Sequence, residues 1–118
     1  MAGLWSRRDK GERYERKAAA LLKRRGYQII ERNFVARGGE IDIVALKGDC
    51  LVFVEVRQRG VGAKESAGES ITARKIRRIK RAAAHFIAQR PAAKKLKIRF
   101  DVVLFDGEKP RHIEGAFT

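Results

Sequence analysis

Two apolar segments, residues 40–46 and 50–57, constrain the fold more than any other feature, because only a tight turn separates them. The turn holds Lys47, Gly48 and Asp49, and Gly-Asp between apolar segments is typical of a β-hairpin. With Gly48 and Asp49 as the central turn residues, Lys47 pairs with Cys50, and each further step pairs the next residue on either side. The sequence thus predicts two adjacent antiparallel strands with a defined register.

This register brings charged side chains together at the open end of the hairpin. Asp42 faces Glu55 and Glu40 faces Arg57, and the twofold alternation of a strand puts all four side chains on one face of the sheet. That end of an otherwise apolar ribbon is therefore predicted to serve a function. The opposite face is uniformly apolar and carries Ile41, Ile43, Val52, Val54 and Val56.

The two facing acids predict a nearby cation. Two carboxylates with Cβ atoms ~5 Å apart repel one another when both are ionised. Mg²⁺ would neutralise them, because it takes oxygen ligands from one or two carboxylates, waters and phosphates. The alternative is structural: Glu40 pairs with Arg57, while Asp42 or Glu55 bonds to a backbone donor or to another arginine. The spacing alone does not decide between the two.

The other segments predict two helices and three more strands. Apolar positions recur at helical spacing over residues 11–25, ended by Gly26, and again from the capping residue Thr72 to a point before Pro91. Strands are expected over residues 27–34, 97–105 and 111–117. The order is then α-β-β-β-α-β-β, one α/β domain over residues 11–118 after a disordered segment, residues 1–10. The glycine-rich residues 58–69 predict a long loop that clamps a ligand.

Both helices are expected to contribute side chains near the acidic pair. Glu15 lies at the border of the apolar stripe of the first helix and can lean over the sheet, whereas Glu12 points toward solvent. On the second helix, Lys75 precedes a core position by one turn and can reach the same edge of the sheet. Asp101 is not assigned to the site, because it alternates with Arg99 and is better explained by an ion pair.

The charge of the chain predicts a polyanionic partner. Lys and Arg number 28 against 14 Asp and Glu, a formal net charge of +14. Nucleic acid fits better than a membrane surface, since the apolar stripe of the second helix is needed for the core. No segment is long enough to span a bilayer and residues 1–10 lack an apolar signal segment, so a cytoplasmic location is expected. The second helix alone holds six basic residues, Arg74, Lys75, Arg77, Arg78, Lys80 and Arg81.

The motif residues also resemble a known family. Gly39-Glu40-Ile41-Asp42 followed by Phe53-Val54-Glu55-Val56-Arg57 is similar to the D…(D/E)xK signature of restriction-endonuclease-like nucleases. More narrowly, the chain resembles the bacterial YraN family, UPF0102. The matching blocks occur in order over nearly all of the chain after residue 10. They include Gly11 with Glu15, Gly26, Asn33, Arg59, Thr72 with Lys75, and residues 99–103 and 116–117.

The resemblance implies a single restriction-endonuclease-like domain, similar to archaeal Holliday junction resolvases, with a mixed sheet of about five strands flanked by two helices. It implies that Asp42 and Glu55 are ligands of Mg²⁺ or Mn²⁺, with Glu15 as a third carboxylate. It favours DNA over RNA, and it implies a homodimer, because junction resolvases need two sites. Position 57 departs from the signature, since arginine replaces the usual lysine. Arginine cannot act as a base, but it can bind a phosphate.

The leading hypothesis is a metal-dependent phosphodiesterase. A metal at the acids would polarise the scissile phosphate and lower the pKa of an attacking water, and Arg57 would stabilise the charge that develops. Two alternatives stay open: a nucleic-acid-binding module that kept the fold and lost the chemistry, and a basic scaffold for acidic protein partners. The expected catalytic residues are Glu15, Asp42, Glu55 and Arg57, and the expected nucleic-acid-binding residues are Arg59, Arg74, Lys75, Arg77, Arg78 and Arg81.

Overall fold

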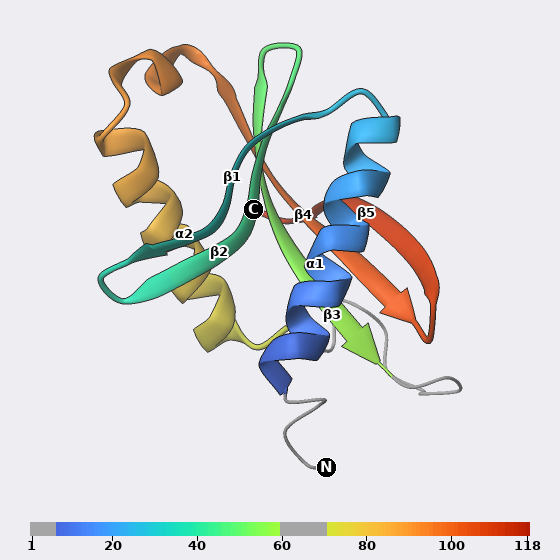
Figure 1. Cartoon of the computed structure of the whole chain (residues 1–118). Helices are drawn as coiled ribbons and strands as arrows, with labels where there is room; N and C mark the ends of the chain where they lie inside the picture. The colour runs from blue at the N-terminus through green and yellow to red at the C-terminus, as the bar shows by residue number, and fades with distance from the viewer. Residues whose placement is uncertain (1–6, 60–70) are drawn as a thin grey trace.

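A five-stranded sheet runs through the middle of the molecule, with one long helix on each face (Figure 1). The structure is a computed structural model that describes residues 7–59 and 71–118. The α/β class and the order of helices and strands predicted from the sequence are confirmed, and a short 3₁₀ helix is an addition. The elements are α1 (Arg7–Arg24), β1 (Gln28–Ala36), β2 (Gly39–Lys47), β3 (Cys50–Arg59), α2 (Ala73–Ala88), the 3₁₀ helix η2 (Pro91–Lys95), β4 (Lys97–Asp106) and β5 (Lys109–Phe117).

Several element boundaries differ from the predicted ones. Helix α1 begins at Arg7, so the last part of the segment expected to be disordered is helical, and β3 continues to Arg59, into the expected loop. Gly26 follows α1 with a φ of 90°, as expected for a helix stop. The disorder expected for residues 1–6 and the ligand-clamping loop expected over residues 60–69 lie outside the described residues. Neither described helix is long and apolar enough to cross a membrane.

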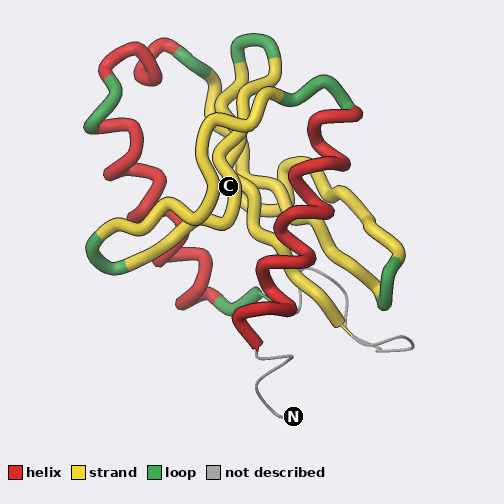
Figure 2. The backbone as a smooth tube through the Cα atoms, in the orientation of Figure 1, coloured by secondary structure: helices red, strands yellow, loops and turns green. Residues whose placement is uncertain are grey.

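The strands lie in the order β1-β2-β3-β4-β5, with β3 parallel to β4 and the other neighbours antiparallel. A parallel pair needs a long crossover, and α2 supplies it between β3 and β4. The central strand β3 is covered on both faces (Figure 2), which explains why its residues 51–55 are buried without interruption. On one face Leu22 of α1 packs with Val54, and on the other Phe86 of α2 packs with Phe53.

The predicted hairpin register is confirmed near the turn but ends before the acidic residues. The pairs of β2 and β3 stop at Ile43–Val54, so the expected backbone pairing of Asp42 with Glu55 is not formed. Beyond Ile43, strand β2 bends toward α2. Ile41 consequently packs in the core on the α2 side, whereas Ile43 packs on the α1 side. The prediction that both share one face was therefore wrong.

An asparagine and a glycine account for the bend. Asn33, which lies opposite Asp42 on β1, has a φ of 55°, in the left-handed region that asparagine tolerates better than most residues. At the β1–β2 turn, a Cβ atom on Gly39 would lie 2.1 Å from the carbonyl oxygen of Arg78. The turn therefore rests directly on α2, and the absence of a side chain at position 39 permits this contact.

Candidate functional site

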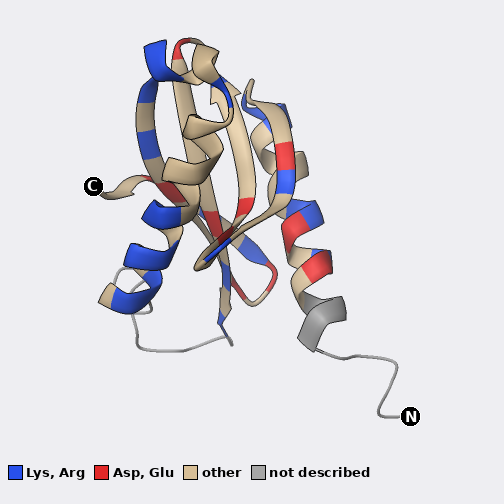
Figure 3. Ribbon diagram, turned by 90° about the vertical axis from the view of Figure 1, so that its left-hand side faces the viewer, with Lys and Arg blue, Asp and Glu red and all other residues tan. Residues whose placement is uncertain are grey.

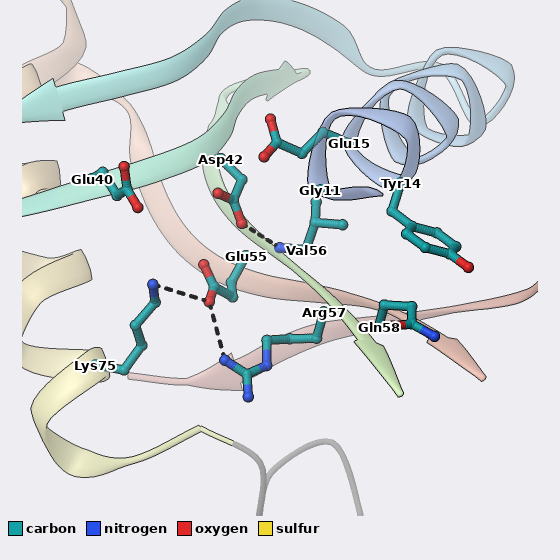
Figure 4. A pocket seen from close by; sticks show the side chains of 10 residues that line it. All are labelled: Gly11, Tyr14, Glu15, Glu40, Asp42, Glu55, Val56, Arg57, Gln58 and Lys75. Carbon is teal, nitrogen blue, oxygen red and sulfur yellow. Dashed lines mark hydrogen bonds and ion pairs between the residues drawn. The ribbon is translucent and has the colours of Figure 1, made fainter. Parts of the chain in front are cut away.

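The candidate site lies where β2 and β3 separate. Because the two strands are no longer paired beyond Val54, the backbone N–H of Val56 needs another acceptor. It donates to the Oδ2 atom of Asp42 at 2.8 Å (Figure 4). The alternative expectation, that an acid of the pair bonds to a backbone donor, is thus met by Asp42. This hydrogen bond holds the Asp42 carboxylate between the strands, next to Glu55.

The buried Glu55 and the half-buried Asp42 form a pair of interacting carboxyl groups. The Glu55 side chain is 4% exposed. Burial, followed by repulsion from Asp42 and a hydrogen bond to it, raises the pKa of Glu55 from 4.5 to about 8, although Lys75 and Arg57 oppose the shift. The protonated form of Glu55 is therefore favoured beside Asp42. A bound dication would take over the role of this proton.

Glu15 approaches the pair from α1 (Figure 4). Burial, followed by repulsion from Asp42 and Glu12, raises the pKa of Glu15 to about 7, while Arg32 and a hydrogen bond from Asn33 lower it. Its Oε1 atom is buried without a hydrogen bond from the described residues, and Nη2 of Arg32 is 3.9 Å away. Glu15 therefore offers an acceptor oxygen beside Asp42 that a cation can use.

Two basic side chains converge on Glu55. The Nζ atom of Lys75 and the Nη1 atom of Arg57 lie 3.6 Å and 3.7 Å from its Oε2 atom (Figure 4). Lys75 is held by the first turn of α2, because its backbone N–H donates to the hydroxyl of the N-cap residue Thr72 at 3.1 Å. Both basic side chains stay about one third exposed, at 32% and 33%. They can therefore contact a bound anion as well as Glu55.

These groups line one cavity of about 670 Å³, which we call the carboxylate pocket. All four predicted catalytic residues line it, so the structure brings them together. The prediction had placed Glu40, Asp42, Glu55 and Arg57 on one flat face of the sheet. Instead, β2 and β3 separate, and side chains from both helices and both strands meet around the gap. The lining residues are Gly11, Tyr14, Glu15, Glu40, Asp42, Glu55, Val56, Arg57, Gln58 and Lys75.

The donor set suits a hard divalent ion. Mg²⁺ and Mn²⁺ prefer oxygen ligands, and one or two carboxylates suffice when waters and phosphate oxygens complete the shell. Asp42 and Glu55 supply such a pair. Across residues 7–59 and 71–118, however, no three His, Cys, Asp or Glu side chains form a ready-made metal cluster. The residues fit an ion held by Asp42 and Glu55, with Glu15 beside it rather than already joined to it.

The predicted nucleic-acid-binding residues lie in three places. Lys75 faces the carboxylate pocket. Arg59 ends β3, where its Nη2 atom lies 3.6 Å from Oδ2 of Asp106. Basic residues recur over successive turns of α2 (Figure 3). Together with Gly38, the other four predicted residues line a second cavity of about 410 Å³, the arginine pocket: Arg74, Arg77, Arg78 and Arg81.

Asp101 does not line the carboxylate pocket, and the predicted ion pair is confirmed. On β4 its buried carboxylate accepts two hydrogen bonds of 2.8 Å from Arg99, one of 2.7 Å from His112 and one of 3.0 Å from the backbone of Gly115. Burial by itself would raise the pKa of Asp101, but the hydrogen bonds from His112, Arg99 and Gly115 bring it below its usual value. Asp101 is thus a fully satisfied structural acid.

Two contributors to the site were missed from the sequence. Asn33 donates a hydrogen bond to Glu15, and its left-handed backbone accompanies the bend in β2. Its signal was an asparagine inside a strand pattern, where this residue type is disfavoured. Val56 acts through its backbone N–H, which no side-chain pattern reveals. Tyr14 packs in the core on the α1 side and also lines the carboxylate pocket.

Comparison with known proteins shows that most of the chain is similar to proteins of one family. Residues 14–105 match the model described as "Uncharacterised protein family UPF0102". A UPF0102 protein of Dechloromonas aromatica is 48% identical over 109 residues, which cover 92% of this chain and 88% of that protein. UPF0102 proteins of Alkalilimnicola ehrlichii and Aeromonas hydrophila are 43% and 40% identical over 110 residues, covering 93% and 92% of this chain and 87% and 85% of those proteins.

The fold and the site together define a class: a small α/β protein in which a pair of acids, one of them buried, lines a cavity beside a basic helix. Within this class, the chain belongs to the UPF0102 family, in agreement with the resemblance found in its motifs.

Proposed function

We propose that this protein is a metal-dependent nuclease that hydrolyses phosphodiester bonds. The observation that carries the proposal is the buried Glu55 next to Asp42, in a cavity flanked by Lys75 and Arg57. A buried carboxyl group next to a second carboxyl group is unfavourable in a purely structural role, whereas a divalent ion makes the same arrangement favourable. Strongly raised pKa values inside a cavity are also a recurrent feature of catalytic sites.

Each residue of the carboxylate pocket has a distinct role in this proposal. Asp42 and Glu55 hold Mg²⁺ or Mn²⁺, and Glu15 completes or orients the ligand set. When bound, the metal supplies Lewis acidity toward the phosphate and lowers the pKa of a water molecule. Arg57 and Lys75 bind phosphate oxygens and stabilise the negative charge that develops on them. Arg57 cannot act as a base, so its contribution is electrostatic.

Nucleic acid is proposed as the substrate because of charge. The formal net charge of +14 attracts polyanions, and the arginines of α2 lie beside Lys75 on the same helix. DNA rather than RNA, branched DNA in particular, and a homodimer belong to the same proposal and rest on the family resemblance. A cytoplasmic location is part of the same proposal and rests on the sequence analysis.

The test is a cleavage assay with purified protein, Mg²⁺ or Mn²⁺, and labelled duplex, single-stranded, flap and four-way-junction DNA, with RNA in parallel. Wild-type protein should give product that disappears with EDTA. Asp42→Asn should lower the rate by about 10²-fold or more, since it removes a metal ligand and a charge from the site. Asp49→Asn changes an exposed acid in the β2–β3 turn and is the matched control, which should retain activity. Undiminished cleavage by Asp42→Asn would contradict the proposal.

A binding module without catalysis is the second candidate, favoured by Arg57 at the position where the signature has lysine. It predicts nucleic-acid binding that weakens with salt, with a slope of about 0.9 per duplex phosphate neutralised, and that EDTA leaves unchanged. It also predicts no product with any divalent ion. A binding isotherm with and without EDTA, run beside the cleavage assay, separates the two candidates.

A further inference from the structure

We propose that the arginine pocket is a separate phosphate-binding site, which holds the backbone of a nucleic acid strand beside the segment that enters the carboxylate pocket. The inference rests on the proposed nucleic acid substrate, but it does not require the acidic pair to be catalytic. Its ligand is the phosphodiester backbone, so the site is expected to contribute affinity and position, not base recognition.

The arginine pocket concentrates positive charge without internal compensation. Its four arginines are exposed, and among the described residues none of them forms an ion pair with an acid. Other arginines of the molecule do have acidic partners, as Arg32 does with Glu12 at 3.0 Å and Arg90 with Glu31 at 2.9 Å. Like charges gathered around one cavity repel one another, so an anion between them is favourable. Guanidinium groups bind phosphate with two parallel hydrogen bonds, which suits this ligand.

Contact between the β1–β2 turn and α2 gives the pocket a defined shape. Gly38 has a φ of 86°, and a Cβ atom there would lie 2.8 Å from Cδ and 2.9 Å from Nη1 of Arg81. The Arg81 side chain thus lies against the turn, while the Arg78 carbonyl faces Gly39. A side chain held against backbone before binding loses less freedom when the ligand arrives. The pocket is therefore partly organised in advance.

The two pockets adjoin along α2. Arg74 lines the arginine pocket and the next residue, Lys75, lines the carboxylate pocket. Gly38 of the β1–β2 turn lines the arginine pocket, and Glu40 near the start of β2 lines the carboxylate pocket. At 1.5 Å per residue, the arginine row from 74 to 81 extends about 10 Å along the helix. A strand offers one phosphate per ~3.4 Å of duplex axis. One strand can therefore place phosphates at the arginines and at Lys75 together, which favours nucleic acid over an acidic peptide.

The test measures binding of a short labelled DNA duplex by fluorescence anisotropy, in EDTA, over a series of NaCl concentrations. Arg78→Gln and Arg81→Gln should each reduce the slope of log affinity against log salt by about 0.9, the loss of one phosphate contact. Arg111→Gln is the matched control: it removes one guanidinium from an exposed residue on β5, at the far edge of the sheet from β1. Its slope should stay near that of the wild type.

Equal slopes in all four proteins, or an equal reduction in Arg111→Gln, would overturn the proposal, because binding would then follow net charge alone. If polyglutamate displaces the duplex as well as an unlabelled duplex of equal charge, the pocket serves acidic proteins instead and the proposal also fails. Circular dichroism checks folding, and Arg74→Gln replaces any variant that is unfolded. If the protein cleaves no substrate, the proposed nuclease function fails. The difference in salt slope measured in EDTA would still support the arginine pocket as a phosphate-binding site.

Discussion

Glu55 and Asp101 are both buried acids on neighbouring strands, β3 and β4, but their surroundings differ in kind. Asp101 accepts hydrogen bonds from Arg99, His112 and Gly115, and its pKa is below the usual value. Glu55 lies next to a second acid, and the nitrogen atoms of Lys75 and Arg57 are 3.6 Å and 3.7 Å from its Oε2 atom. The pKa of Glu55 is raised to about 8. Burial of an acid does not by itself indicate function. The balance of donors around it separates a structural acid from one prepared for a cation.

The largest effect on stability should come from replacing Asp101, the buried acid whose hydrogen bonds are all formed. Asp101→Asn removes the charge that pairs with Arg99 and leaves the donors around it without a charged acceptor. The free energy of unfolding should fall by about 3 kcal/mol or more, as when one partner of a buried ion pair is lost. Urea denaturation at neutral pH measures this, with the isosteric change Glu55→Gln as its counterpart in the carboxylate pocket. If Asp101→Asn were as stable as the wild type, the distinction between the two acids would fail.

Mn²⁺ should stabilise the folded protein only by binding in the carboxylate pocket. At a free Mn²⁺ concentration of 100 times Kd, the gain in unfolding free energy is about 2.7 kcal/mol. At a fixed free Mn²⁺ concentration, the gain should be larger at pH 9 than at pH 6, because Glu55, with a pKa of about 8, must release its proton before it binds metal. Thermal melting with and without Mn²⁺ measures the gain. Asp42→Asn should abolish it, and an equal gain in that variant would place the ion elsewhere.

The pH dependence of stability should have opposite signs for the two acids. The pKa of Glu55 is raised on folding, so the folded state loses stability as pH rises from about 4.5 to about 8. Glu55→Gln should therefore match the stability of the wild type near pH 4 and exceed it at pH 9. The pKa of Asp101 is lowered, so its contribution is present above its usual pKa of 3.8 and is lost as pH falls. Unfolding curves that give no advantage to Glu55→Gln at pH 9 would contradict the raised pKa.

The same contrast shows which features the sequence could predict. The hairpin turn, the stop of α1 at Gly26, the Thr72 cap of α2 and the closeness of Asp42 to Glu55 follow from local turn chemistry and from periodicity, and these predictions agree with the structure. The separation of β2 from β3 could not be predicted, because it depends on the contact of Gly39 with α2, which is distant in the sequence. The alternation rule assumed an undistorted strand, and for that reason it put Ile41 on the wrong face.

The partners of Asp101 illustrate the same limit. Arg99 was predicted as its ion-pair partner because both residues lie on one strand with a spacing of two, which alternation alone reveals. His112 and Gly115 come from β5, and their contacts depend on the pairing of β4 with β5 and on the irregularity in that pairing next to Asp101. Local patterns therefore predict which acids are unusual, whereas the tertiary contacts decide whether each is satisfied.

Glu15 is intermediate between the two acids and gives the smallest effect. It receives a hydrogen bond from Asn33 and lies 3.9 Å from Arg32, yet burial and the nearby Asp42 raise its pKa to about 7. Glu15→Gln should gain less stability at pH 9 than Glu55→Gln does, and none near pH 4, because the pKa of Glu15 is raised less, to about 7. It should also weaken Mn²⁺ binding less than Asp42→Asn does, since Glu15 stands beside the acidic pair. Titration of both variants with Mn²⁺, followed by thermal melting, tests this order; the reverse order would make Glu15 rather than Asp42 the principal ligand.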